Sequence, residues 1–318
     1  VLEFKPKTNE WGDLEEIIES SQTIDVPVFD HTALLTPAAD EVILGGRNCE
    51  TSPLTSCQAK TFAATGVTQI SVPTHRNEDG DSEWTPSGML GSKRASHTST
   101  LLHDGRILTC GGSNGVIPLS TCEIMDPVTK TWTATGAMTI PRTNHTATLL
   151  PNGAVLAAGG STPPGGVTSS AEIYYPLTQR WSPVASMTQG RQNHAATLLP
   201  DGNVLVTGGA TLSTFSATCD IYITSAAVWI SSASIGQMNT ARAQHTATLL
   251  KNGNVLVTGG VNGFGAVAKT EIYSFTGRTF SSPGGSDLNT ARYDHTANLL
   301  RDGRVIVIGG SDNAHSIR

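Results

Sequence analysis

One stretch of this chain recurs at intervals of about 50 residues, and this repeat limits the possible folds more than any other feature. The clearest copy, RTNHTATLLPNGAVLAAGG, covers residues 142–160. A repeat of this length is typical of architectures in which one supersecondary unit is used many times. The other copies are RASHTSTLLHDGRILTCGG from Arg94, RQNHAATLLPDGNVLVTGG from Arg191, RAQHTATLLKNGNVLVTGG from Arg242, RYDHTANLLRDGRVIVIGG from Arg292 and the divergent VFDHTALLTPAADEVILGG from Val28.

Each repeat predicts four short strands, which we name a to d. The run HTATLL is strand a, and the Asp-Gly or Asn-Gly pair after it predicts a hairpin turn, because these pairs tolerate positive φ. The run VLVTGG is strand b, and after a variable loop AEIYY (171–175) is strand c. Strand d carries an aromatic residue. Because each repeat is predicted to consist of four strands, the chain is predicted to be all-β. The aromatic positions are Trp11, Trp84, Trp132, Trp181, Trp229 and Phe280.

The two ends of the chain complete each other. Residues 1–11 align with strands c and d through Pro6 and Trp11, whereas the last copy of the repeat stops just before its strand c is due. We therefore expect a single domain over residues 1–318, a six-bladed β-propeller with four antiparallel strands per blade. Residues 1–14 would close one blade together with 292–318, because a closed ring leaves no open edge strand. The alternative is a fragment of a longer propeller that lacks a seventh blade.

At this point the sequence resembles a known family. The glycine pair after strand b, the aromatic-Pro-x-Thr motif and the Trp of strand d resemble Kelch repeats. The form R-x-x-H-T-A-T-L-L is similar to the extracellular bacterial and fungal type, which includes the propeller of galactose and glyoxal oxidases. The resemblance implies a propeller fold and leaves function open, because one propeller scaffold hosts many activities.

The copper site of those oxidases does not carry over. The resemblance implies a Tyr immediately before one repeat His, but no Tyr stands there in this chain. Tyr293 is one position too early relative to His295. The residues that precede the histidines are Asp30, Ser96, Asn144, Asn193, Gln244 and Asp294.

Arginine and histidine recur at the start of strand a. Because strand a is innermost in a propeller, these side chains are predicted to ring one mouth of the central channel. They could bind an anion or a metal there, or they could tie neighbouring blades together at buried polar positions. A catalytic site needs one constellation and not a copy in every blade, which favours the structural interpretation. The residues are His31, Arg94, His97, Arg142, His145, Arg191, His194, Arg242, His245, Arg292 and His295.

The first repeat departs from the pattern. It has Val28 in place of the arginine, and two of its loops are enlarged. Because loops vary where the scaffold does not constrain them, we expect this blade to contribute most to a binding face formed by the d–a and b–c loops. Its acidic run, HRNEDGDSEW (75–84), predicts either a solvated turn or a Ca²⁺ site; no other cofactor is expected. The calcium candidates are Glu78, Asp79, Asp81 and Glu83.

The net charge, the hydropathy and the cysteines limit the classes of partner and the compartment that the sequence predicts. The net charge is −6, and no basic cluster points to nucleic acid. No apolar run reaches the roughly 18 residues of a membrane span. Cys49 with Cys57 and Cys110 with Cys122 have spacings that suit two local disulfides, which predicts an extracellular or cell-surface protein. Free thiols are the alternative.

We therefore expect a protein- or glycan-binding or assembly module that acts through the face of the d–a and b–c loops. Two alternatives remain open. One is a carbohydrate-active or oxidoreductase-like enzyme with its site at the same channel mouth. The other is a structural subunit of an extracellular assembly, which would include self-association into an oligomer.

Overall fold

The structure is a computed structural model. It describes the backbone of residues 2–5, 10–13, 32–35, 41–44, 47–49, 62–64, 67–76 and 82–88, and backbone and side chains over residues 89–283 and 287–314. Within these residues one short helix, α1 (Ser232–Ile235), accompanies the strands. The prediction of an all-β chain is confirmed.

The described strands form six four-stranded antiparallel sheets, which we number in chain order. Sheet 1 consists of β3 (Thr32–Leu35), β4 (Glu41–Leu44), β7 (Val67–Arg76) and β8 (Ser82–Met89). Sheet 2 consists of β9 (Thr98–Leu101), β10 (Ile107–Cys110), β11 (Cys122–Asp126) and β12 (Thr131–Thr135). Sheet 3 consists of β13 (Thr146–Leu149), β14 (Val155–Ala158), β17 (Ala171–Tyr175) and β18 (Arg180–Val184).

The remaining sheets follow the same plan. Sheet 4 consists of β19 (Ala195–Leu198), β20 (Val204–Thr207), β21 (Cys219–Ile223) and β22 (Val228–Ser231). Sheet 5 consists of β23 (Thr246–Leu249), β24 (Val255–Thr258), β27 (Thr270–Ser274) and β28 (Thr279–Ser281). Sheet 6 consists of β29 (Thr296–Leu299), β30 (Val305–Ile308), β1 (Leu2–Lys5) and β2 (Glu10–Asp13). Three small hairpins lie in b–c loops: β5 (Arg47–Cys49) with β6 (Phe62–Ala64), β15 (Ser161–Thr162) with β16 (Gly166–Val167), and β25 (Val261–Asn262) with β26 (Gly265–Ala266).

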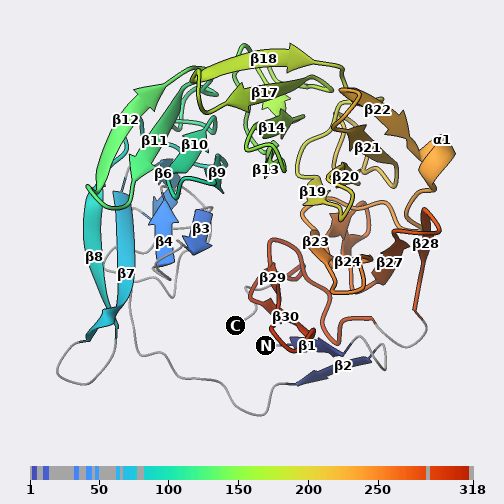
Figure 1. Ribbon diagram of the computed structural model, residues 1–318. Helices are drawn as coiled ribbons and strands as arrows, with labels where there is room; N and C mark the ends of the chain where they lie inside the picture. Colours follow the sequence, from blue (N-terminus) through green and yellow to red (C-terminus); the bar gives the residue numbers. More distant parts are fainter. Residues whose placement is uncertain are drawn as a thin grey trace.

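The sheets are arranged around a common axis with their first strands innermost (Figure 1). These inner strands contact one another in the series β3, β9, β13, β19, β23 and β29. Sheet 6 combines both ends of the chain, because β1 pairs with β30 through Leu2 opposite Val307 and Phe4 opposite Val305. Because the strands within each sheet run antiparallel, the described b–c and d–a loops lie near one end of the axis.

The core lies between the sheets. Strands β10, β14, β20 and β24 are buried along their whole length because each lies in the middle of its sheet and is covered on both faces. The repeated aromatic of strand d packs on a tyrosine of strand c, with ring centroids of Tyr174 and Trp181 5.2 Å apart. Trp181 also donates its indole N–H to the carbonyl of Gly136 in the preceding repeat, at 3.0 Å. The aromatic position therefore joins neighbouring sheets.

Candidate binding face

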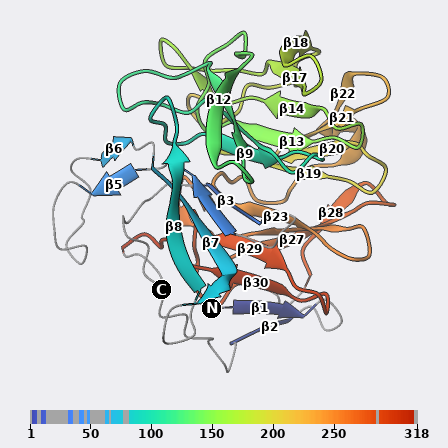
Figure 2. The same ribbon diagram turned by 60° about the vertical axis from the view of Figure 1, so that its left-hand side comes forward.

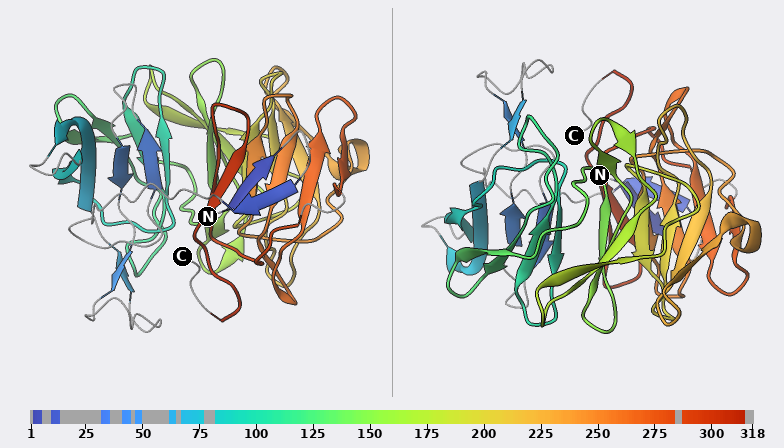
Figure 3. Two further views of the ribbon diagram at one scale, coloured as in Figure 1. Left: turned by 90° about the horizontal axis from the view of Figure 1, so that it is seen from below. Right: turned by 90° about the horizontal axis from the view of Figure 1, so that it is seen from above.

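Hydrogen bonds show which loops share a face. The amide of Gly112, in the b–c loop of sheet 2, donates to the carbonyl of Arg142, in the next d–a loop, and the Arg142 amide donates back to Leu119. We call the side that carries these loops the loop face. At the other end, the turn face, the Thr224 amide after strand c donates to Asn203 Oδ1 of the a–b turn, at 3.0 Å. Figure 3 shows the molecule from two sides, with loops extending at both ends.

The repeated arginine lies buried beneath the loop face and pairs with an acid of its own sheet. Arg142 Nη1 donates to the Gly159 carbonyl, and Nη2 donates to Glu172 Oε1, each at 2.7 Å. Burial lowers the pKa of the Arg142 guanidinium, and the Glu172 carboxylate opposes this change. The arginine thereby ties strand c to the glycine pair after strand b. The same ion pairs are Arg94 with Glu123, Arg191 with Asp220 and Arg242 with Glu271.

The acidic residue that pairs with the repeated arginine was not predicted from the sequence, although the sequence carries a signal for it. In sheet 1, where Val28 replaces the arginine, the register position of the acid holds Gln69, opposite Ile43. In sheet 6 the same register position holds Leu2, and Arg292 donates to the Gly309 carbonyl at 2.8 Å. The arginine and the acid are thus absent together in the divergent repeat.

The repeated histidine links neighbouring sheets. His145 Nε2 lies 2.9 Å from Thr98 Oγ1 of sheet 2, and His194 and His295 make the same contact with Thr146 and Thr246. The preceding glycine pair makes room for the ring. Gly111 has φ +67°, and a Cβ there would lie 2.7 Å from His145 Cε1.

Burial keeps these histidines neutral. Burial and, secondarily, the nearby Arg191 lower the pKa of His194 to about 3, and burial lowers the pKa of His295 to about 4. Burial lowers the pKa of His145 and His245 well below their ordinary value too. The described arginines and histidines therefore lie together beneath the loop face as a buried frame. Their role in ligand binding stays a prediction, and His31 lies outside the described residues.

A series of backbone hydrogen bonds lies next to this frame. From sheet 3 to sheet 6, the residue before the histidine donates its amide to the carbonyl of its counterpart in the preceding sheet, as Asn193 does to Asn144 at 3.0 Å. These residues have positive φ, which short polar side chains tolerate better than branched ones. The sequence did not predict that these residues join neighbouring sheets. We call this series of hydrogen-bonded residues the belt. The belt runs through Ser96, Asn144, Asn193, Gln244 and Asp294.

The loop face carries exposed apolar side chains at the tips of its b–c loops, and the sequence interpretation missed them. Phe264 is 99% exposed, Val116 87% and Leu212 74%. The tips are held by their own hydrogen bonds. Asn262 Oδ1 accepts the amide of Phe264, and Asn114 Oδ1 accepts the amides of Val116 and Ile117.

The enlarged first repeat contributes on both faces. Its hairpin β5–β6 is part of the b–c connection between β4 and β7 and stands out from the sheets (Figure 2). The acidic run (75–84) instead covers the end of β7, the c–d connection and the start of β8. Of the calcium candidates, Glu78, Asp79 and Asp81 lie outside the described residues, and only the backbone of Glu83 is described. Over the described residues, no group of three His, Cys, Asp or Glu side chains is placed to hold a metal ion.

One predicted disulfide is confirmed. Cys110 and Cys122 are bonded across the directly opposite positions of β10 and β11. The pair of Cys49 and Cys57 stays a prediction, since Cys57 and the Cys49 side chain lie outside the described residues. Cys219 is a buried free thiol opposite Thr207, and burial raises its pKa to about 12.

Comparisons with known proteins agree with this architecture. The Kelch motif matches residues 94–139 and 141–188. A solved structure titled "Structure of YjhT" superimposes with a TM-score of 0.69 at 13% identity, covering 92% of this chain and 93% of that chain. A search of the curated proteins found no match. No helix among the described residues is long and apolar enough to cross a membrane. The chain is thus a β-propeller-like protein that carries Kelch motif repeats.

Proposed function

We propose that this protein is a binding module that holds a partner protein on its loop face. The observation that carries the proposal is the set of exposed apolar side chains on b–c loop tips of several repeats. Phe264 stands almost fully exposed, as do Val116 and, less completely, Leu212. Exposed apolar side chains that recur at the same place in several repeats offer contact points for an apolar protein partner.

The order of these tips adds to the argument. The Asn114 and Asn262 side chains fix the loops by accepting amides two or three residues ahead. Ala266 at the base of the Phe264 tip donates its amide to Asn313 Oδ1 of the next repeat, at 2.6 Å. A surface already ordered loses less conformational entropy when it binds. Aliphatic tips such as Val116 and Leu212 favour an apolar protein surface over a glycan, which stacks on aromatic rings.

The repeated arginines and histidines serve the frame beneath this surface. Arg142 is engaged by Glu172 and by the Gly159 carbonyl, and His145 by Thr98. An enzyme at the same mouth would therefore need other side chains as its acid, base or nucleophile. This distribution of roles supports binding over catalysis.

We further propose that the six sheets are the blades of one closed ring. The inner strands contact in series from β3 to β29, and β1 pairs with β30. Docking of sheet 6 against sheet 1 would complete the ring and leave no gap in the loop face. The Cys110–Cys122 disulfide supports an oxidising compartment, either extracellular or at the cell surface. That location agrees with the resemblance to the propeller of galactose and glyoxal oxidases.

Site-directed photo-crosslinking tests the proposed face. A benzophenone amino acid replaces Phe264 in one variant and Leu177, an equally exposed residue of the turn face, in the other. Both proteins are exposed to the extracellular proteins of the source cells, and the adducts are identified by mass spectrometry. We expect a defined protein adduct at position 264 that position 177 does not form. Equal adducts at both positions, or none at 264, would contradict the proposal.

A further inference from the structure

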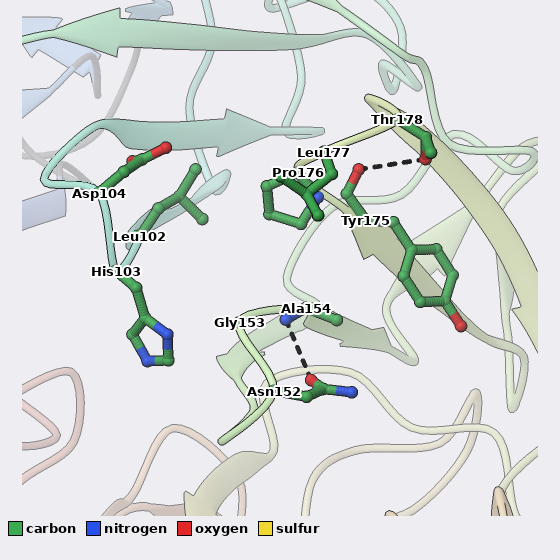
Figure 4. A pocket seen from close by; sticks show the side chains of 10 residues that line it. All are labelled: Leu102, His103, Asp104, Asn152, Gly153, Ala154, Tyr175, Pro176, Leu177 and Thr178. Carbon is green, nitrogen blue, oxygen red and sulfur yellow. Dashed lines mark hydrogen bonds between the residues drawn. The ribbon is translucent and has the colours of Figure 1, made fainter.

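A cavity of about 540 Å³ opens on the turn face, between sheets 2 and 3 (Figure 4). It lies away from the proposed binding face, because its walls are a–b and c–d turns. Sheet 2 contributes its a–b turn, and sheet 3 contributes both its a–b turn and its c–d turn. The walls are formed by residues 102–104, 152–154 and 175–178.

The repeat explains why the cavity is found here. In sheet 4, Asn203 Oδ1 accepts the amide of Thr224 at 3.0 Å, and in sheet 5 Asn254 Oδ1 accepts the amide of Phe275 at 3.1 Å. These bonds join the a–b turn to the c–d turn. At the same two positions sheet 3 has Ala154, which has no side-chain acceptor, and Pro176, which has no N–H. Sheet 3 therefore lacks both the acceptor and the donor of this hydrogen bond.

In sheet 2 a large side chain occupies the position that Ala154 has in sheet 3. Sheet 2 also has a proline after strand c, Pro127, but Arg106 stands where sheet 3 has Ala154. The Arg106 side chain turns back to Asp104, with Nε 2.9 Å and Nη2 2.6 Å from Oδ2. Among sheets 2 to 5, sheet 3 alone combines the proline with a side chain as small as alanine.

The chemistry of the walls selects the ligand. The walls are mostly apolar, with Leu102, Ala154 and Pro176 among them. The carboxylate of Asp104 is already balanced by Arg106, so the pocket has no uncompensated acid. Its other polar side chains include the His103 imidazole, the Asn152 amide and the hydroxyl groups of Tyr175 and Thr178. Asn152 Oδ1 accepts the Ala154 amide at 3.1 Å.

We propose that this pocket binds a small, neutral, mostly apolar ring compound with one hydrogen-bonding group. The cavity volume falls in the range of about 300–1,000 Å³ that is typical of small-molecule sites. The ring would lie against the apolar wall, and its polar group would reach His103 or Asn152. A net charge on the ligand would lose its hydration without gaining a free counter-charge.

Indole is a suitable probe, with indole-3-acetate and tryptamine as matched anionic and cationic probes. Binding is followed by ¹H–¹⁵N NMR titration of the full chain. We expect indole to shift the amides of Gly153, Ala154 and Leu177, and the two charged probes to bind at least about tenfold more weakly. No saturable shift at these amides, or equal binding of all three probes, would overturn the proposal.

Two variants copied from the neighbouring repeats supply the structural control. Ala154→Arg copies sheet 2, and the double variant Ala154→Asn, Pro176→Thr copies the bonded pair of sheet 4. Both should fill the pocket and weaken indole binding at least about tenfold, while distant amides of the spectrum stay unchanged. If either variant folds as the wild type and still binds indole with the same affinity, the pocket is not the site.

Discussion

Arg142 and Glu172 form a buried ion pair in which Nη2 and Oε1 lie 2.7 Å apart. We predict that Arg142→Ala lowers the free energy of unfolding by about 3–5 kcal/mol, because it leaves the Glu172 carboxylate buried without its partner. Urea denaturation at neutral pH measures the change. Arg106→Ala is the control, since Arg106 pairs with Asp104 at the surface and its loss should cost less than about 1 kcal/mol. Equal losses in the two variants would contradict a framework role for Arg142.

The Tyr222 hydroxyl offers a place to stabilise the protein. In the preceding repeat, the Tyr174 hydroxyl lies 2.6 Å from Thr135 Oγ1, but the hydroxyl of Tyr222 is buried without a partner. Val184 occupies the register position that Thr135 holds in sheet 2. We predict that Val184→Thr adds this hydrogen bond and stabilises the fold by about 1 kcal/mol. Thermal or urea unfolding should show no such gain in a Tyr222→Phe background, and a gain there would refute the explanation.

Stability should fall as the pH drops below about 6.5. The pKa of His194 is lowered to about 3 and that of His295 to about 4 in the folded chain, whereas unfolded histidine titrates near its ordinary value of about 6.5. Between about pH 6.5 and the lower pKa of the folded chain, the histidine is therefore protonated in the unfolded state but not in the folded state. Each such histidine lowers the free energy of unfolding by about 1.4 kcal/mol per pH unit in that range. Urea unfolding at pH 7, 6 and 5 measures the slope. His194→Gln removes one of these titrating groups and should therefore lower the slope of unfolding free energy against pH by the contribution of one histidine. An unchanged slope would refute the lowered pKa of His194.

Pairing of the two chain ends can be tested by a disulfide. Glu3 lies directly opposite Ile306 in the register of β1 and β30. We predict that the double variant Glu3→Cys, Ile306→Cys forms this bond within one chain under oxidising conditions. Peptide mapping without reductant identifies the link, and the two single variants are controls. A bond formed only between different chains would show that β1 is not seated on β30 of its own chain.

The strands were predictable because each repeat carries its own local signals. The Asn-Gly pair of residues 152–153 and the aromatic Trp181 locate a hairpin and a strand from neighbouring residues alone. The disulfide of Cys110 and Cys122 was predictable for the same reason, since its two residues flank one loop.

The buried ion pairs and the pocket were not predicted because they depend on register between distant strands. Glu172 reaches Arg142 only after β17 has paired with β14, which places Glu172 opposite Ala157. The pocket depends on what two side chains lack, namely the acceptor at Ala154 and the N–H at Pro176. Aligned repeats carry part of the signal for the ion pair, because the divergent first repeat lacks both the arginine and the acid, although the last repeat keeps Arg292 opposite a register position that holds Leu2.

The affinity of loop-face variants for the crosslinked partner tests the central claim most directly. The triple variant Val116→Ser, Leu212→Ser, Phe264→Ser alters the loop face, and Val128→Ser, Leu177→Ser alters equally exposed residues of the turn face. Calorimetric titration with the purified partner measures both against the wild-type chain. We predict at least a tenfold loss of affinity, about 1.4 kcal/mol, for the loop-face variant and wild-type affinity for the turn-face variant. Wild-type affinity in the loop-face variant, with its melting temperature unchanged, would contradict the claim that this face binds the partner.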